Sequence, residues 1–558
     1  LCYASVGVTN VASGTLTSLD LSAVKQSPGV IDVITISDIP GHTDIGPVFG
    51  GDPILLDKEV KFHGQPVFAV LAETQEQARV AATKATMTFA EAEAILTTDE
   101  ALAADAKVRP THEFGRGDVS NTLQSAPLTA SGHLSVGGQE HMYLEGQVSL
   151  AIPEEEDRMS IFTSSQHPSE VQKLVAEVLD VKLHRVAVDM RRMGGGFGGK
   201  ESQAAQWACL AAVFALRTRR AVKMRLPRMM DMQVTGKRHP FENDYEIAFN
   251  ESGKMLGAKV TVSGNCGHSP DLSDAIVDRA MFHVDNAYQL GDTHVTGHRL
   301  KTNIVSHTAF RGFGGPQGLI MAELLMDVVA RKTGLDPLSV RKLNLYGQEN
   351  GTVTPYGMPL EQDILADLIG KLEADSNYWQ RREEVKAFNG ASPIIKKGLA
   401  LTPVKFGISF TAKHLNQAGA LLHIYTDGSI QVNHGGTEMG QGLYTKIGQI
   451  VAHEFGVSLD NIEVTATRTD KVPNTSPTAA SSGTDLNGKA AQNACITIKE
   501  RLAGFFAEQF NVPAEDVIFA AGQVSAGGHH LPFTQLIQNA YMARISLSAT
   551  GYYRTPKI

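Results

Sequence analysis

The chain has 558 residues, a formal net charge of -9, 42% hydrophobic residues and 20% charged residues. At about 150 residues per domain this length predicts three or four domains, and the apolar fraction excludes a mainly disordered chain. The acidic balance argues against a general nucleic-acid binder, which needs a basic surface. The longest apolar run, residues 207–216, is too short to cross a membrane. Four cysteines without a CxxC pair exclude a disulfide scaffold and a zinc or iron–sulfur site built from cysteines.

The first part of the chain predicts a small α+β unit. Residues 29–40 and 65–73 have the alternation of strands, and a helix is predicted over residues 74–85, with Thr74 as its N-cap. From about residue 91 to 127 the sequence is poor in aromatic residues and has no firm periodicity. We therefore predict a linker that lies over the surface there.

A second unit is predicted from residue 131 onward. Its expected strands and helices cover residues 148–155, 159–166, 167–179, 185–190, 204–216 and 318–334. Residues 242–265 predict a hairpin with its turn at 250–253. A charged stretch near residues 370–390 marks the next boundary, and a third unit follows with a hairpin whose turn carries Asp427 and Gly428. The mixed order of elements predicts α+β layers instead of one doubly wound sheet.

The sequence contains 53 glycines, and many of them are clustered. The first cluster, "RRMGGGFGGKES" at residues 191–202, fits the pattern GxGxxG between a strand and a helix. The acidic residue that a dinucleotide fold needs about 20 residues later is missing. The cluster also nearly fits a phosphate-binding loop, but Glu201 stands where Ser or Thr should bind Mg²⁺. Both nucleotide interpretations fail at the residue that carries the chemistry, and nucleotide binding is kept only as an alternative.

Three further clusters occupy residues 307–318, 434–446 and 473–485. Each of them alone is typical of an ordinary loop. Glycine lets backbone approach a ligand closely, so four such loops on distant segments favour a large cofactor gripped by backbone amides from several sides.

The strings "GGQEHMYLE", "RRMGGGFGGKE", "TAFRGFGGPQ", "FGISFTAKHLNQAGALLHIYTDGSI", "GGTEMGQGLYTK" and "PNTSPTAAS" occur in this order along the chain. Together they resemble the molybdenum-binding part of the xanthine dehydrogenases, within the molybdenum hydroxylase family, over essentially the whole sequence. The resemblance implies an α/β-hammerhead-like domain at residues 1–105 and a linker at 106–130. It implies two molybdopterin-binding α+β domains at residues 131–370 and 371–558.

The resemblance also implies a molybdenum–molybdopterin cofactor. In it the pterin holds the metal, and no side chain binds the metal directly. Gln166 matches a glutamine that bonds an oxygen of the molybdenum centre. The other matching cofactor-binding positions are Phe197, Gly198, Arg311, Gly440, Gln441, Gly442, Ala479 and Ala480. FAD and two [2Fe-2S] clusters are expected on a partner subunit.

For the substrate, Phe313 and Phe410 match two rings that sandwich a purine. Glu201 and Arg279 match catalytic groups at the purine edge, with Thr411 beside them. A carboxylate accepts from a purine N–H, and a guanidinium donates to a carbonyl oxygen on which negative charge develops. Each residue alone has an ordinary alternative, such as a helix first turn, a helix surface or a core aromatic. Aldehyde oxidases of the family carry apolar residues at positions 201 and 279, so this pattern favours purines.

The implied reaction is hydroxylation of hypoxanthine and xanthine to urate, with oxygen from water and electrons passing to the iron–sulfur and FAD subunit. A cytoplasmic heterotetramer with two copies of each subunit is expected, with no nucleic acid or membrane as partner. The family's general base is a glutamate in a Gly-Glu-Pro-type motif, which these 558 residues do not contain. We therefore expect a fragment that lacks both ends and this base. An aldehyde oxidase-like enzyme and an apo scaffold that only docks its redox partner remain alternatives.

Overall fold

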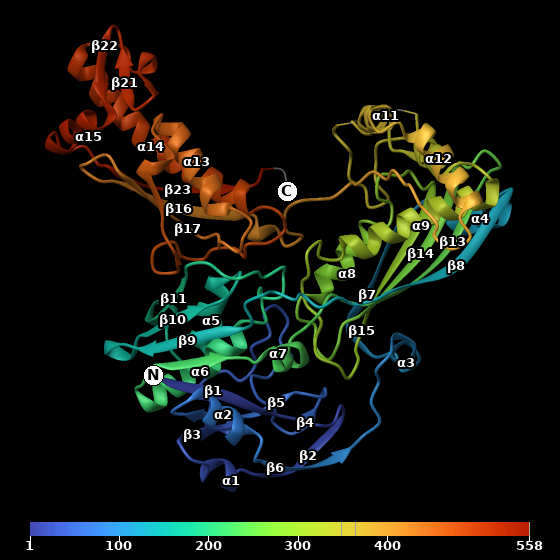
Figure 1. Ribbon diagram of the computed structural model, residues 1–558, viewed down its shortest axis with the longest axis horizontal. Helices are drawn as coiled ribbons and strands as arrows, with labels where there is room; N and C mark the ends of the chain where they lie inside the picture. Colours follow the sequence, from blue (N-terminus) through green and yellow to red (C-terminus); the bar gives the residue numbers. More distant parts are fainter. Residues whose placement is uncertain (348, 363, 557–558) are drawn as a thin grey trace.

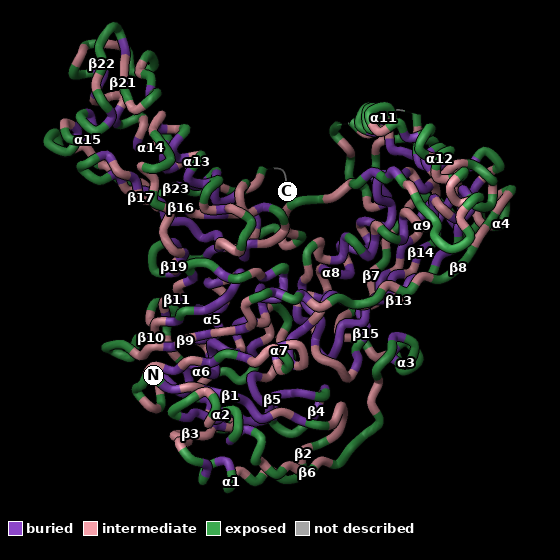
Figure 2. The backbone as a smooth tube through the Cα atoms, viewed as in Figure 1, coloured by how far each residue is buried: buried purple, intermediate pink, exposed green. Residues whose placement is uncertain are grey.

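The structure is a computed structural model that describes all residues except 348, 363 and 557–558. Figure 1 shows a lower block that contains the N-terminus, and two lobes that extend from it. Buried residues are concentrated in the sheets and in the helices that pack against them (Figure 2). The loops that carry the glycine clusters lie where the three parts meet.

The lower block is built on a mixed eight-stranded sheet. Its strands, in spatial order, are β19 (Thr467–Arg468), β11 (Val186–Met190), β10 (Met159–Thr163), β9 (Val148–Pro153), β12 (Val222–Arg225), β1 (Cys2–Val8), β5 (Pro66–Ala72) and β3 (Val30–Ile34). β1 pairs in parallel with β12, so strands from the start of the chain belong to the sheet that carries the first glycine cluster.

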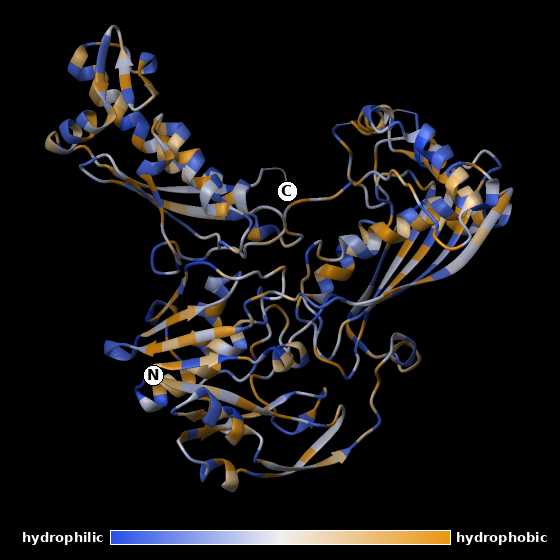
Figure 3. Ribbon diagram, viewed as in Figure 1, coloured by the Kyte–Doolittle hydropathy of each residue, from blue (hydrophilic) through white to orange (hydrophobic). Residues whose placement is uncertain are grey.

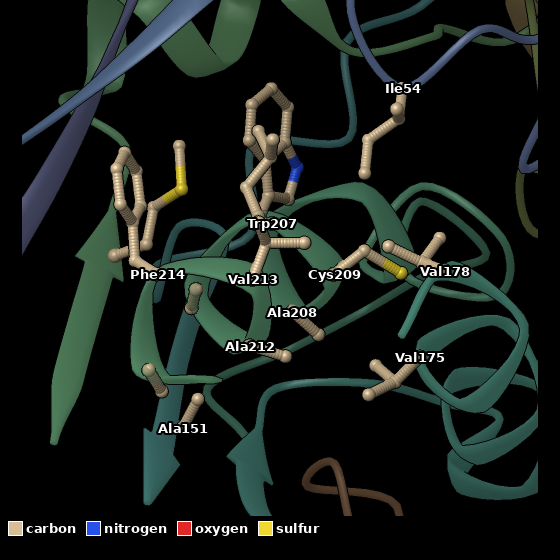
Figure 4. Close-up of a cluster of buried hydrophobic side chains, with 14 of the residues drawn as sticks. Ile54, Ala151, Val175, Val178, Trp207, Ala208, Cys209, Ala212, Val213 and Phe214 are labelled. Carbon is tan, nitrogen blue, oxygen red and sulfur yellow. The ribbon is translucent and has the colours of Figure 1, made fainter. Parts of the chain in front are cut away.

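Helix α6 (Ala205–Thr218) fills the core of this block together with α5 (Pro168–Val178). Trp207 and Phe214 of α6 are buried (Figure 4), and apolar residues line most of its circumference (Figure 3). The apolar run at residues 207–216 is therefore a buried helix. Among the described residues, no helix combines the length and the apolar character needed to span a membrane.

A smaller sheet completes the N-terminal part. It contains β4 (Glu59–Val60), β2 (Gly14–Asp20) and β6 (Thr86–Glu91), and the helices α1 (Ser22–Lys25) and α2 (Gln75–Ala82) lie near it. The next helix, α3 (Thr98–Ala103), contacts the sheet of the right-hand lobe. The predicted N-cap of α2 is confirmed, because Thr74 accepts a hydrogen bond from the backbone N–H of Gln77 in a capping box.

The right-hand lobe in Figure 1 has a five-stranded sheet covered by helices. Its strands are β7 (Lys107–Arg116), β15 (Asp292–Leu300), β14 (Met255–Asn265), β13 (Phe241–Phe249) and β8 (Leu128–Val136). Its helices are α4 (Val119–Ser125), α8 (Ser273–Met281), α9 (Gly315–Thr333), α10 (Pro337–Asn344), α11 (Leu365–Asp375) and α12 (Tyr378–Ala391), and α7 (Arg228–Val234) lies nearer the centre. The predicted hairpin is confirmed as β13–β14, and α9 ends at Gly334 in the left-handed conformation, as predicted.

The expected linker at residues 106–130 is wrong as a structureless segment. It contains β7, which pairs with β15 at the edge of the sheet, and α4. An edge strand that buries neither face fully has no clear alternation of apolar residues, so the sequence pattern missed it. Beyond this segment, Tyr378 and Leu401 pack into the core of the same lobe.

The third lobe carries the C-terminal part of the chain. Its main sheet consists of β18 (Ile462–Val464), β17 (Ile430–His434), β16 (Gln417–Ile424) and β23 (Ser548–Arg554), and α13 (Leu443–Phe455) and α14 (Gly483–Phe510) pack against it. At the tip lie β20 (Ile518–Ala520), β21 (Gln523–Ala526), β22 (His529–Pro532) and α15 (Phe533–Met542). The predicted hairpin is confirmed as β16–β17, whose turn carries Asp427 and Gly428.

Candidate functional site

The buried side chain of Gln166, just after β10, joins the first and fourth glycine clusters. Its Oε1 accepts from the backbone N–H of Gly198 at 2.8 Å, and its Nε2 donates to the carbonyl of Thr478 at 3.1 Å. The backbone N–H of Thr478 donates in turn to the carbonyl of Gln166 at 2.9 Å. This glutamine therefore fixes the Phe197–Gly198 loop against the loop that holds Ala479 and Ala480.

Backbone hydrogen bonds bring the other two clusters to the same place. The N–H of Arg311 donates to the carbonyl of Phe197 at 2.8 Å, which attaches the second cluster to the first. The N–H of Met193 donates to the carbonyl of Glu438 at 3.0 Å, which attaches the third cluster. The four clusters, far apart in the sequence, form one connected surface.

Three candidate residues, together with Ser409 next to Phe410, have left-handed backbone, which is uncommon for residues with a side chain. The φ angles are 54° at Phe197, 49° at Phe313, 84° at Ser409 and 54° at Ala480. Such conformations cost about 1–3 kcal/mol each and cluster at functional sites. Their occurrence in three of the joined loops supports a site at this junction.

Two glycines of the first cluster are needed where protein loops approach one another. A Cβ on Gly196 would lie 2.6 Å from Oε1 of Gln166, and one on Gly198 would lie 2.6 Å from the carbonyl oxygen of Ala309. These glycines let protein loops approach one another, so loop packing explains them without a ligand. In the third cluster, by contrast, a Cβ on Gly440 or Gly442 would meet nothing within 4 Å.

The amides of the third cluster are engaged within the loop itself. The N–H groups of Gly440 and Gly442 donate to Oε1 of Glu438 at 2.9 and 3.0 Å. Gln441 donates from Nε2 to the carbonyl of Thr437. The Glu438 carboxylate thus caps the start of α13. Sequence reasoning missed this residue, because it binds backbone amides and no fixed motif identifies it.

Glu201 presents a buried carboxyl beside these loops. Its backbone N–H donates to the carbonyl of Gly198, and the residue is 9% exposed. Burial is the main cause that raises the pKa of Glu201 to about 8, and the carboxylates of Glu170 and Asp271 contribute to the same rise. The group is therefore a neutral acid near pH 7, able to donate as well as accept a hydrogen bond. Glu170 and Asp271 were not among the residues singled out from the sequence.

Arg279 of α8 is 5% exposed and faces the segment that precedes Phe410. Its Nη1 and Nη2 donate to the carbonyl oxygens of Gly407 and Ser409 at 2.5 and 2.6 Å, while its Nε lacks a partner within the described residues. The N–H of Ser409 donates to the carbonyl of Ala480 at 3.0 Å. Arg279 is thus connected to the site, with hydrogens still free on the guanidinium.

The structure places Phe313 and Phe410 but leaves their predicted role as an aromatic pair untested. Phe313 and Phe410 are both half-buried, and among the described residues neither ring stacks on another aromatic ring. Thr411 is exposed, and within the same residues its side chain makes no hydrogen bond with Glu201 or Arg279. The sandwich around a substrate and the role of Thr411 stay predictions.

Lys200 decides against the phosphate-loop alternative. A phosphate-loop lysine reaches the bound phosphates, whereas Lys200 is 0% exposed and points into the protein. Its Nζ donates to the carbonyl oxygen of Glu145 at 2.6 Å and to Oγ of Ser164 at 2.8 Å. No group of three or more His, Cys, Asp or Glu side chains in the described part of the chain is arranged to hold a metal ion.

Three family models match the chain. The model for the "Aldehyde oxidase and xanthine dehydrogenase, a/b hammerhead domain" matches residues 1–93. Two models for a "Molybdopterin cofactor-binding domain" match residues 103–345 and 371–558.

Curated relatives agree with these models along the whole chain. Xanthine dehydrogenase from Calliphora vicina is 40% identical over 100% of this chain and 40% of its own length. Xanthine dehydrogenase/oxidase from Gallus gallus is 39% identical over 100% of the chain and 39% of its own length. The chain belongs to the xanthine dehydrogenase and aldehyde oxidase family of molybdenum hydroxylases. It spans about 40% of the length of these curated relatives.

Solved structures of other oxidoreductases share the fold. Quinoline 2-oxidoreductase from Pseudomonas putida 86 aligns over 100% of this chain and 75% of its own, with a TM-score of 0.86 at 20% identity. The aldehyde oxidoreductase from Desulfovibrio desulfuricans aligns over 100% and 60%, with a TM-score of 0.85 at 22% identity. The family models and this likeness confirm the predicted hammerhead and molybdopterin-binding α+β fold.

Substitution of Gly198 tests the packing of the loops. A methyl group in Gly198→Ala would collide with the carbonyl of Ala309 on left-handed backbone, φ +103°, so the two loops must separate. We expect a loss of about 1–3 kcal/mol in unfolding free energy beyond that of the control, measured by chemical denaturation. The control is Gly334→Ala, at φ +72° with open space around its Cβ, where only backbone strain of about 1 kcal/mol applies. Equal losses in the two variants would refute the packing role.

The buried acid predicts a pH-dependent stability difference. Glu201 holds its proton more tightly in the folded protein, with a pKa of about 8, than in the unfolded chain, where 4.5 is usual. Between pH 4.5 and 8 the folded state therefore binds more protons than the unfolded state. The free energy of unfolding falls as the pH rises through this window. The melting temperature of Glu201→Gln, relative to that of wild type, should rise across this window and stay constant above it. Glu383→Gln, at an exposed position, should show no such trend.

Proposed function

We propose that this chain is the molybdenum-binding part of a purine-hydroxylating enzyme that converts hypoxanthine and xanthine to urate. The observation that carries the proposal is the junction of Glu201 and Arg279 with the four loops. The buried, neutral carboxyl of Glu201 follows the loop that binds Arg311, and the buried guanidinium of Arg279 holds the segment that leads to the half-buried Phe410. This set suits a flat heterocycle with both N–H and carbonyl groups on its edge.

The residues present fit a molybdenum–pterin cofactor. Gly440 and Gly442 expose bare backbone to open space, and the Phe197 ring is 43% exposed at the opposite loop. The Arg311 side chain is exposed and has no hydrogen-bond partner in the described part of the chain. Bare backbone, an aromatic face and a free guanidinium suit a planar, phosphate-bearing group.

When bound, the cofactor would supply the oxygen that derives from water and would take up the electrons of the reaction. Gln166, Phe197, Gly198, Arg311, Gly440, Gln441, Gly442, Ala479 and Ala480 are the residues we propose to hold it. Gln166 already spends Oε1 on Gly198 and one Nε2 hydrogen on Thr478, so one amide hydrogen is left to reach a cofactor oxygen.

At the substrate, Phe313 and Phe410 would hold the purine plane. Arg279 would donate a remaining N–H to a purine carbonyl oxygen and stabilise the negative charge that develops on it. Glu201 would hold a proton at its carboxyl oxygen and share it with a purine ring nitrogen. Because its carboxyl is buried and neutral, it can do so without placing a third negative charge beside Glu170 and Asp271.

The partner of this chain is proposed on the same grounds. A subunit or segment with two [2Fe-2S] clusters and FAD would carry the electrons away, since none of the cysteine patterns for such clusters occurs in this sequence. We propose a heterotetramer with two copies of each part.

The test of the proposed function uses the complete enzyme that contains this chain. Metal analysis should find molybdenum, and xanthine should give urate, followed by its ultraviolet absorbance. Absence of both molybdenum and urate would refute the proposal, and aldehyde oxidation without urate would assign the enzyme to the aldehyde branch.

Arg279→Met tests substrate choice. Removing a buried, charged donor should lower kcat/KM for xanthine about 10- to 100-fold, and the loss for an aldehyde should be far smaller. Arg331→Met, at the exposed end of α9, is the control and should leave both rates unchanged. An equal loss on purine and aldehyde would mean that Arg279 acts only by holding the carbonyls of Gly407 and Ser409.

A further inference from the structure

Glu145 binds both ends of the first glycine loop, residues 194–200. The backbone N–H of Glu145 donates to the carbonyl of Gly194 at 3.1 Å, and the carbonyl of Glu145 accepts from Nζ of Lys200 at 2.6 Å. Close packing reinforces the first contact, because a Cβ on Gly194 would lie 2.7 Å from Cβ of Glu145. Lys200 is thus the side chain that closes the loop.

The ammonium group that closes the loop is fully buried. Lys200 is 0% exposed, its second hydrogen bond goes to Oγ of Ser164 at 2.8 Å, and Nζ lies 4.6 Å from the centre of the Tyr143 ring. The Glu145 carboxylate is 3.8 Å away and 41% exposed. A buried ammonium is costly compared with an apolar side chain of similar volume, so its contribution must lie in the directed bonds that it makes.

The same residue also sets the position of Gln166. The carbonyl oxygen of Lys200 accepts from the backbone N–H of Gln166 at 2.8 Å and from Oγ of Ser165 at 3.3 Å. Gln166 in turn binds the N–H of Gly198, and Glu201 follows Lys200 directly in the chain. Any movement of Lys200 is therefore transmitted to both the glutamine and the acid of the site.

We propose that Lys200 is a positioning residue whose ammonium, bound to the backbone of Glu145, holds Gln166 and Glu201 in the arrangement needed for turnover. The inference rests on the proposed function only in that Gln166 and Glu201 face cofactor and substrate. The closed loop itself is a property of the chain and can be measured without turnover.

The test compares Lys200→Met with wild type in the complete enzyme. Methionine keeps much of the volume but removes the donors, so kcat per bound molybdenum should fall at least about tenfold, with KM changed far less. Amide hydrogen exchange of a peptide that spans residues 194–201 should become at least about tenfold faster. Turnover is followed with xanthine and with an aldehyde, so a failure of the purine assignment leaves this test intact.

Two further variants distinguish the hydrogen bonds of the Lys200 ammonium from its ion pair with Glu145. Glu145→Gln keeps the backbone atoms that bind Gly194 and Lys200 and removes only the charge of the partly exposed carboxylate 3.8 Å from Nζ, so both readouts should stay within about twofold of wild type. Ser164→Ala removes one acceptor and should lower kcat about threefold, which supplies a result if Lys200→Met fails to fold.

Three results would overturn the inference. The first is an unchanged kcat per molybdenum in Lys200→Met. The second is a loss in Glu145→Gln as large as that in Lys200→Met, which would assign the effect to the ion pair. The third, when Lys200→Met does not fold, is a wild-type rate and wild-type exchange in Ser164→Ala.

Discussion

The two-sided amide of Gln166 is the contact on which the site depends. It joins Gly198 and Thr478, and the second of these hydrogen bonds spans 312 positions of sequence. Because the amide is buried, loss of either bond would leave a polar group without a partner, at a cost of about 1–3 kcal/mol. The position of Phe197, and through it that of Arg311, follows from this contact. Gln166 thus links the first and fourth loops directly and the second loop through Phe197.

Local features could be read from the sequence because their causes are local. Thr74 caps its helix through a residue three positions away, and Gly334 ends α9 because left-handed backbone suits glycine. The pairing of β1 with β12 could not be predicted, since nothing in residues 2–8 specifies a partner more than two hundred positions later. β7 was missed for a related reason, because it is held by the edge of a sheet and not by a buried face of its own.

As with the fold, only some residues of the site could be predicted from the sequence. The resemblance predicted Gln166, Glu201 and Arg279 as site residues, and hydrogen bonds in the structure connect the segments that carry them. The supporting residues were not found, because Glu438 acts on backbone amides and has no fixed motif. The glycines illustrate why composition alone misleads. Gly198 is required by the approach of another protein loop, whereas Gly440 faces open space, and the two are equivalent in a sequence pattern.

The adjacent residues Lys200 and Glu201 show how the loop controls the charge of the site. An ammonium beside the Glu201 carboxyl would favour ionisation and lower its pKa. The loop instead turns the Lys200 side chain into the core, where Glu145 and Ser164 bind it. Glu201 is then influenced by burial and by the carboxylates of Glu170 and Asp271, and each of these raises its pKa. The fold therefore obtains a structural cation and a neutral acid from neighbouring positions by giving the two side chains different neighbours. A neutral acid at this place can hydrogen-bond a heterocycle in either direction, which an ionised carboxylate could not do.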